Sequence, residues 1–149
     1  MKKIKNFNIR TDVYYDTAEG YWIDVKGNTA RIGMSPLVQE TSGSFVAIGI
    51  NKIGTSHAKG SSYGSVEAEK HVGHLKMSVS GKITAVNEKV LANPRLINTD
   101  PYGKGWLVEV EMSNFQAEKG DLLGGESKIV AWFTAEINKY EEKGWLAEI

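Results

Sequence analysis

Cysteine is absent from the 149 residues of this chain. Its absence excludes disulfides, thiolate metal sites, iron–sulfur clusters and a cysteine nucleophile. Any sulfur redox chemistry would therefore need a sulfur atom brought in by an attached group. A chain without cysteine fits a reducing compartment, and we expect a cytoplasmic protein.

Long apolar runs and an excess charge of one sign are also missing. No apolar run approaches the roughly 18 residues that a membrane-spanning helix needs. The basic start at Met1–Asn6 is not followed by the apolar segment of a signal peptide. The chain has 18 Lys and Arg against 18 Asp and Glu, so its formal net charge is zero. We therefore expect neither a membrane nor a nucleic acid among its partners.

Short patterned runs separated by glycines predict an all-β fold with short helices. Residues 21–25 and 29–33 flank Gly27 and indicate a hairpin. Ser35 and Pro36 are typical of a helix start, with Gly43 at its end, and Asn87 is expected to cap a second helix that runs to Leu91. Further strands are predicted at 45–50, which we expect to be buried, and at 75–79, 82–86 and 105–112.

The C-terminal segment has a different period. Between residues 126 and 140 the large apolar side chains recur on one face of a helix. We expect this face to pack on the sheet rather than to dock a partner, and Gly144 to end the helix. We therefore expect one domain at 1–125 and a helical extension at 126–149 packed on it. The residues on this face are Ile129, Trp132, Phe133, Ile137 and Tyr140.

Two motifs that suggest catalysis or metal binding have weak support. Gly60–Gly64 matches the G-x-S-x-G nucleophile elbow, which needs a preceding strand, a following helix and a late histidine. Here a turn precedes the motif and a strand-like run follows it. His71 and His74 would point to opposite faces of a strand. We therefore expect no catalytic residue and no metal site.

Lys70 lies between two strand-like runs, 64–69 and 71–79. This arrangement predicts a lysine at the tip of a hairpin, where a modifying enzyme can reach its amine.

The chain resembles the H-protein family, the lipoyl carriers of the glycine cleavage system, from about Tyr15 to Asn114. Four stretches carry the resemblance in the same order as in the family. Gly64-Ser65-Val66-Glu67-Ala68-Glu69-Lys70-His71 is similar to the family's G-[ST]-V-E-S-V-K-A box. The other three are 33–43, similar to G-I-T-x-x-A-Q-x-x-x-G; 86–98, similar to V-N-x-x-L-x-x-x-P-x-L-[IV]-N; and 101–107, similar to P-Y-x-x-G-W-L.

The resemblance implies a barrel-sandwich hybrid fold and a non-catalytic protein with lipoate in amide linkage on Lys70. It also implies that Glu67, three residues before the lysine, and Gly81, eleven after it, help a lipoate ligase or lipoyl transferase to recognise the site. Lys76, in Leu75-Lys76-Met77, resembles part of a biotin-carrier motif. Lys76 lies only five residues before Gly81, whereas the family's spacing is eleven, so the spacing favours Lys70 as the modified lysine.

The family function implies an arm that carries an aminomethyl group between glycine decarboxylase, aminomethyltransferase and dihydrolipoyl dehydrogenase. Three positions that line the family's cleft depart from its pattern: Tyr21 replaces a glutamate, Thr41 a histidine, and His74 an acidic residue. An H-like lipoate-binding protein that carries sulfur beside a heterodisulfide-reductase-like complex is therefore an alternative. An unmodified scaffold or regulator with the same fold is another.

Overall fold

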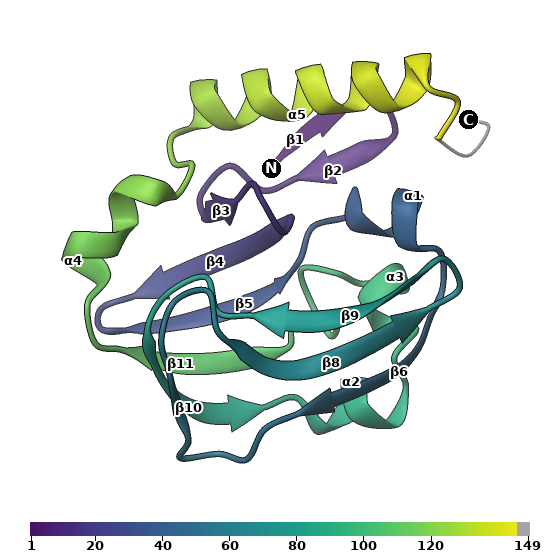
Figure 1. Cartoon of the computed structure of the whole chain (residues 1–149). Coiled ribbons are helices and arrows are strands. Elements are labelled where there is room, and N and C mark those ends of the chain that lie inside the picture. Colours follow the sequence, from purple (N-terminus) through teal and green to yellow (C-terminus); the bar gives the residue numbers. More distant parts are fainter. Residues whose placement is uncertain (146–149) are drawn as a thin grey trace.

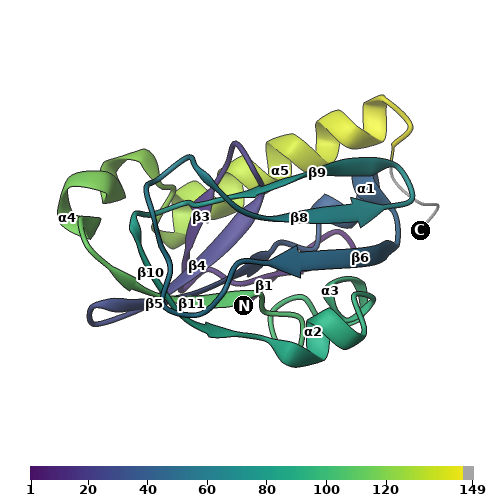
Figure 2. The ribbon, with the colours of Figure 1, turned by 60° about the horizontal axis from the view of Figure 1, so that its bottom comes forward.

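Two facing sheets form the body of the protein, whose computed structural model describes residues 1–145 (Figure 1). The larger sheet has six antiparallel strands and the smaller has three. Figure 2 shows β6, β8 and β9 side by side, with α1 near the end at which the β8–β9 turn lies. The larger sheet has the order β3 (Tyr14–Asp16), β4 (Tyr21–Lys26), β5 (Thr29–Met34), β11 (Val108–Met112), β10 (Gly81–Val86) and β7 (Ser56–His57). The smaller has the order β6 (Phe45–Ile50), β8 (Ser62–Ala68) and β9 (His71–Lys76).

The space between the two sheets holds the main hydrophobic core. Inward-facing side chains of both sheets are fully buried there, among them Ile23, Ile32, Tyr63, Leu75 and Ile83. Alternating inward and outward positions on β8 and β10 place one face of each strand in this core. The arrangement confirms the predicted barrel-sandwich fold.

Short helices connect the strands, and one long helix follows them. The short elements are α1 (Val38–Ser42), α2 (Glu88–Ala92), α3 (Leu96–Thr99), α4 (Phe115–Glu118) and the 3₁₀ turn η1 (Lys119–Asp121). The long helix is α5 (Glu126–Glu142). None of the helices within residues 1–145 combines the length and apolar character needed to cross a bilayer.

Helix α5 covers a second core on the outer side of the larger sheet. Ile129, Phe133 and Ile137 are fully buried there, so the predicted apolar face packs inside the protein. Its partners include Trp22 of β4 and the two-stranded sheet of β1 (Lys2–Ile4) and β2 (Phe7–Ile9), which the sequence analysis did not predict. Figure 1 shows α5 lying along β1 and β2.

Several predicted elements are confirmed with shifted bounds. The 21–33 hairpin forms as β4 and β5, and the Asn87 side chain caps α2 by accepting the Lys89 N–H at 3.1 Å. The strand predicted at 75–79 ends at Lys76, and the one predicted at 105–112 begins at Val108.

Two local predictions are wrong. The first short helix begins at Val38 rather than Ser35: Leu37 is its N-cap residue and makes no side-chain cap, and the Ser35 carbonyl accepts the Val38 N–H at 3.2 Å from the turn before the helix. Strand β6 is not buried, since Val46 and Ala47 face solvent at an edge of the smaller sheet.

Candidate functional site

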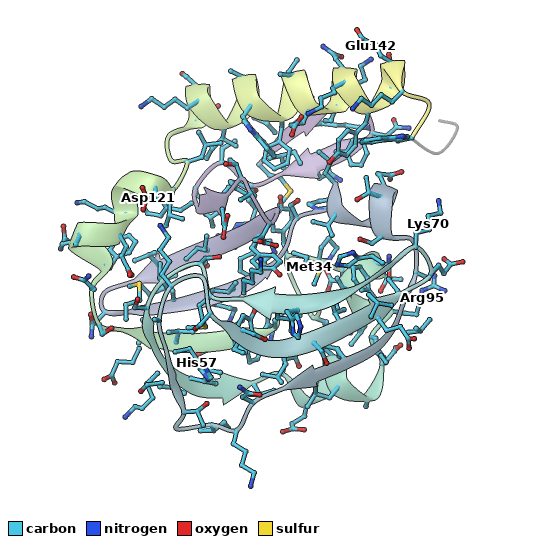
Figure 3. All side chains as sticks on the ribbon, viewed as in Figure 1. Met34, His57, Lys70, Arg95, Asp121 and Glu142 are labelled. Atoms are coloured by element: carbon cyan, nitrogen blue, oxygen red, sulfur yellow. The ribbon has the colours of Figure 1, made fainter. Side chains whose placement is uncertain are left out.

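Lys70 lies at the tip of the β8–β9 hairpin, in the two-residue turn between Ala68 and His71, which form the last cross-strand pair. The residue is exposed, and Figure 3 shows its side chain extending outward from the turn. No ion pair of its ammonium is found within residues 1–145. The amine is thus accessible to a modifying enzyme, at the hairpin tip that the sequence predicted.

Three hydrogen bonds fasten this turn to the end of α1 and to the loop between α1 and β6. The Lys70 N–H donates to the Ser42 carbonyl at 2.9 Å, and the Glu69 N–H donates to the Ser44 carbonyl at 3.0 Å. In return, the Glu69 carboxylate accepts the Ser44 N–H at 2.7 Å. This last bond lowers the pKa of Glu69. Glu69 therefore ties down the turn that presents Lys70.

The loop that receives these bonds has a backbone that suits glycine. Gly43 ends α1 with a φ of 75°, and a Cβ at this position would lie 3.0 Å from the Glu69 carboxylate oxygen. Asn98 of α3 holds the same loop from its other side. Its amide oxygen accepts the Phe45 N–H at 3.0 Å and its amide nitrogen donates to the Gly43 carbonyl at 3.0 Å. The base of the Lys70 turn is consequently well supported.

Glu67 and Gly81, the two predicted recognition residues, lie on different sheets. Glu67 is exposed on the outer face of the smaller sheet, paired across the strands with Ala47 and Val72. Gly81 is buried in β10, where a Cβ would lie 2.3 Å from the Glu111 carbonyl oxygen. Packing alone therefore requires a glycine at position 81, and the recognition role of both residues stays a prediction.

A cleft of about 260 Å³ lies beside the Lys70 turn. It brings together the three departures noted in the sequence, Tyr21 of β4, Thr41 of α1 and His74 of β9. The β3–β4 turn adds Glu19, and α5 adds Glu136. The sequence analysis missed both glutamates as cleft residues, because no local pattern links these distant segments.

The two histidines of β9 lie on opposite faces of the strand, as predicted: His71 is on the side of the buried Leu75, and His74 is on the exposed side, where it pairs with Ser65. Both residues nevertheless contribute to the lining of the cleft, which borders β9 at the edge of the smaller sheet. A Cβ at position 73 would lie 2.8 Å from the His71 ring nitrogen, so Gly73 leaves room for that ring over the strand. No group of three metal-ligating side chains occurs within residues 1–145.

The G-x-S-x-G motif does not form a nucleophile elbow. Ser62 lies within β8, and another strand rather than a helix follows it. The Ser62 hydroxyl shares a hydrogen bond with His74 Nδ1 at 3.3 Å and donates to the Gly64 carbonyl at 3.0 Å. The first contact joins β8 to β9, and the second lies within β8.

Comparisons with known proteins agree with this arrangement. The family model for the glycine cleavage H-protein matches residues 13–134. The glycine cleavage system H protein of Carboxydothermus hydrogenoformans is 44% identical over 108 residues, which are 72% of this chain and 82% of that protein. That of Mycobacterium avium is 38% identical over 130 residues, 87% of this chain and 92% of that protein.

The fold of the chain is also similar to that of a solved H-protein structure. The crystal structure of a glycine cleavage system H protein from Mycobacterium marinum superposes with a TM-score of 0.71 at 33% identity. The superposition covers 83% of this chain and 98% of that one. The chain belongs to the glycine cleavage H-protein family.

Proposed function

We propose that this chain is the lipoyl carrier of a glycine cleavage system and that Lys70 bears the lipoyl group. Members of the family carry lipoate covalently on a lysine. The observation that carries the assignment to Lys70 is its exposed amine at the tip of the β8–β9 hairpin, within the sequence box that resembles the family's attachment site.

The lipoyl group would supply a cyclic disulfide: one sulfur would take up the aminomethyl group as the S–S bond breaks, and the dithiol left after transfer of that group would be reoxidised by the dehydrogenase. The chain itself holds and presents this arm. Acylation removes the positive charge of Lys70, and the hydrogen bonds from the turn to Ser42 and Ser44 fix the base from which the arm swings. A tether of this kind raises the effective concentration of one reactive group at successive partner sites. The adjacent cleft offers the end of the arm a place with restricted access to water.

The proposed partners are the enzymes of the glycine cleavage system: glycine decarboxylase, aminomethyltransferase and dihydrolipoyl dehydrogenase. A lipoate ligase or lipoyl transferase would attach the arm, with Glu67 as a recognition contact. The protein contributes no catalytic residue in this scheme and acts in the cytoplasm. The proposed division at residue 125 makes 126–149 an extension of the carrier domain, although the family match runs to residue 134.

The sulfur-carrying role beside a heterodisulfide-reductase-like complex is not favoured. The relatives described above are named glycine cleavage system H proteins. The cleft retains two carboxylates, Glu19 and Glu136, although positions 21 and 74 are not acidic.

The proposal is tested by incubating the purified protein with a lipoate ligase, ATP and lipoate. The intact mass should rise by one lipoyl group. Lys70→Arg should abolish this rise, because a guanidinium is not acylated by the ligase. The matched control, Lys76→Arg, should gain the group normally. A gain that persists in Lys70→Arg and disappears in Lys76→Arg would assign the arm to the other lysine. No gain in the wild type, with a ligase that modifies another H protein, would favour the unmodified scaffold.

A further inference from the structure

The turn that carries Lys70 is a two-residue hairpin loop of a less favoured kind. Ala68 and His71 form the last cross-strand pair, so Glu69 and Lys70 alone connect β8 to β9. The favoured two-residue turns have a positive φ at their first residue or at both residues, because the twist of these turns matches that of the strands. Within residues 1–145, Lys5 is the only non-glycine residue with a positive φ, so neither residue of the Lys70 turn has one.

The β1–β2 hairpin shows the contrast within the same chain. Its loop also has two residues, Lys5 and Asn6, between the paired Ile4 and Phe7. Lys5 has a φ of 53° there, as the first residue of a favoured turn requires. The Lys70 turn lacks this local support, so contacts from outside the hairpin have to hold its conformation.

Those contacts come from the 42–44 segment, which is the end of α1 and the loop after it. The N–H groups of both turn residues donate to carbonyls of this segment, and the Glu69 carboxylate accepts the Ser44 N–H. Glu69 also packs against the segment, since a Cβ added at Gly43 would lie 3.1 Å from the Glu69 Cβ. The carboxylate is the only side-chain group in these three hydrogen bonds, so it is the part of the support that a substitution can remove.

Asn98 of α3 fixes the same segment with three hydrogen bonds of its own. Its amide nitrogen donates to the Gly43 carbonyl at 3.0 Å and to the Gln39 side-chain oxygen at 3.2 Å. Its amide oxygen accepts the Phe45 N–H at 3.0 Å. One side chain thus joins α1, the loop after it and the start of β6, and the Lys70 turn is bonded to a fixed base.

This base determines how the amine is presented. The Lys70 N–H is itself one of the bonded groups, so the backbone from which the amine extends has a defined position. A modifying enzyme that binds the turn does not have to order it first. A segment that is already ordered loses less conformational entropy on binding, which favours the complex.

We propose that Glu69 and Asn98 are positioning residues for the acylation of Lys70. Both act on the 42–44 segment, and together they hold the hairpin turn in the conformation that the lipoylating enzyme recognises. The proposal rests on Lys70 as the attachment site. It adds two residues to the recognition residues that the family resemblance implies.

Steady-state kinetics of lipoylation by a lipoate ligase, with the unmodified protein as the varied substrate, test this role. Glu69→Val should raise the KM for the protein about two- to tenfold, the range expected for the loss of one hydrogen bond, and leave kcat unchanged. Glu69→Gln keeps an oxygen that can accept the Ser44 N–H and should restore the KM. The matched control Glu88→Val removes an exposed carboxylate of α2 and should have no effect.

Asn98→Ala should raise the KM in the same way, once urea denaturation has shown that the variant is folded. Because both side chains act through the same segment, the rise in the double variant Glu69→Val/Asn98→Ala should be smaller than the product of the two single rises. If Asn98→Ala does not fold, the Glu69 variants decide the test alone.

An unchanged KM in Glu69→Val would overturn the proposal. A KM in Glu69→Gln as high as that in Glu69→Val would also overturn it, because the enzyme would then recognise the charge itself. Both results leave a lipoylated Lys70 and the proposed function intact. A wild type that the ligase does not modify, beside a control H protein that it does, would instead remove the proposed function and the positioning role together.

Discussion

The Lys70 turn and the neighbouring cleft are built in different ways. The turn is held by hydrogen bonds between Glu69 or Lys70 and residues 42–44, which are the end of α1 and the loop after it. The cleft is assembled from the β3–β4 turn, α1, β9 and α5, which are far apart in the sequence. A local motif can therefore identify the turn. The residues that line the cleft cannot be found from any one local motif.

Among the substitutions that distinguish the Lys70 turn from the cleft, Phe133→Ala should have the largest effect on the free energy of unfolding. Phe133 is fully buried in the core under α5, with its ring 4.9 Å from that of Tyr15. The substitution should lower the free energy of unfolding by about 3–5 kcal/mol, as measured by urea denaturation. Lipoylation of the folded protein at Lys70 should persist, since the turn does not depend on α5.

Thr134→Ala, an exposed change on the same helix, is the matched control and should leave the stability nearly unchanged. Loss of lipoylation in folded Phe133→Ala would show that the two regions are not independent.

Gly81→Ala separates packing from enzyme recognition. The new Cβ would meet the Glu111 carbonyl and the Val110 side chain in β11. Overpacking of this kind should lower the free energy of unfolding by about 1–3 kcal/mol in urea denaturation. The ligase should still modify the folded fraction at the wild-type rate. A slower ligation with unchanged stability would instead support the recognition role inferred from the family resemblance.

The sequence predicted the parts of the site that depend on local pattern. The alternation on both sides of Lys70 predicted the hairpin tip, and Asn87 predicted a helix cap that the structure contains. The strands of β1 and β2 are only three residues long, which is too short for a clear periodicity. Glu19 and Glu136 line one cleft only because tertiary packing brings the β3–β4 turn near α5, so no spacing in the sequence groups them.

Glu69→Val tests whether the turn is held by a side chain. Loss of the carboxylate removes the acceptor of the Ser44 N–H, so the Ser44 amide should exchange its hydrogen severalfold faster in NMR exchange measurements. Glu69→Gln keeps an acceptor oxygen and should largely restore the protection. Equal exchange in wild type and Glu69→Val would show that the backbone bonds alone hold the turn.

The hydrogen bond between Glu69 and the Ser44 N–H should depend on pH. This dependence is the smallest of the predicted effects. The hydrogen bonds from Ser44 lower the pKa of Glu69 from its ordinary value of 4.5. A lowered folded-state pKa means that the stabilisation is complete above 4.5 and is lost as the pH falls through the folded value. The NMR shift of the Ser44 amide should titrate with a midpoint below 4.5, and a midpoint above 4.5 would contradict the contact.

The assignment of the arm is tested most directly by peptide mapping of the protein after co-expression with a lipoate ligase. Proteolysis and tandem mass spectrometry locate the modified lysine without any substitution. The structure predicts a lipoyl group on Lys70 and unmodified side chains at the other lysines, including Lys76 on the adjoining strand. A lipoyl group on Lys76, or an unmodified Lys70 beside a fully lipoylated control H protein, would contradict the assignment.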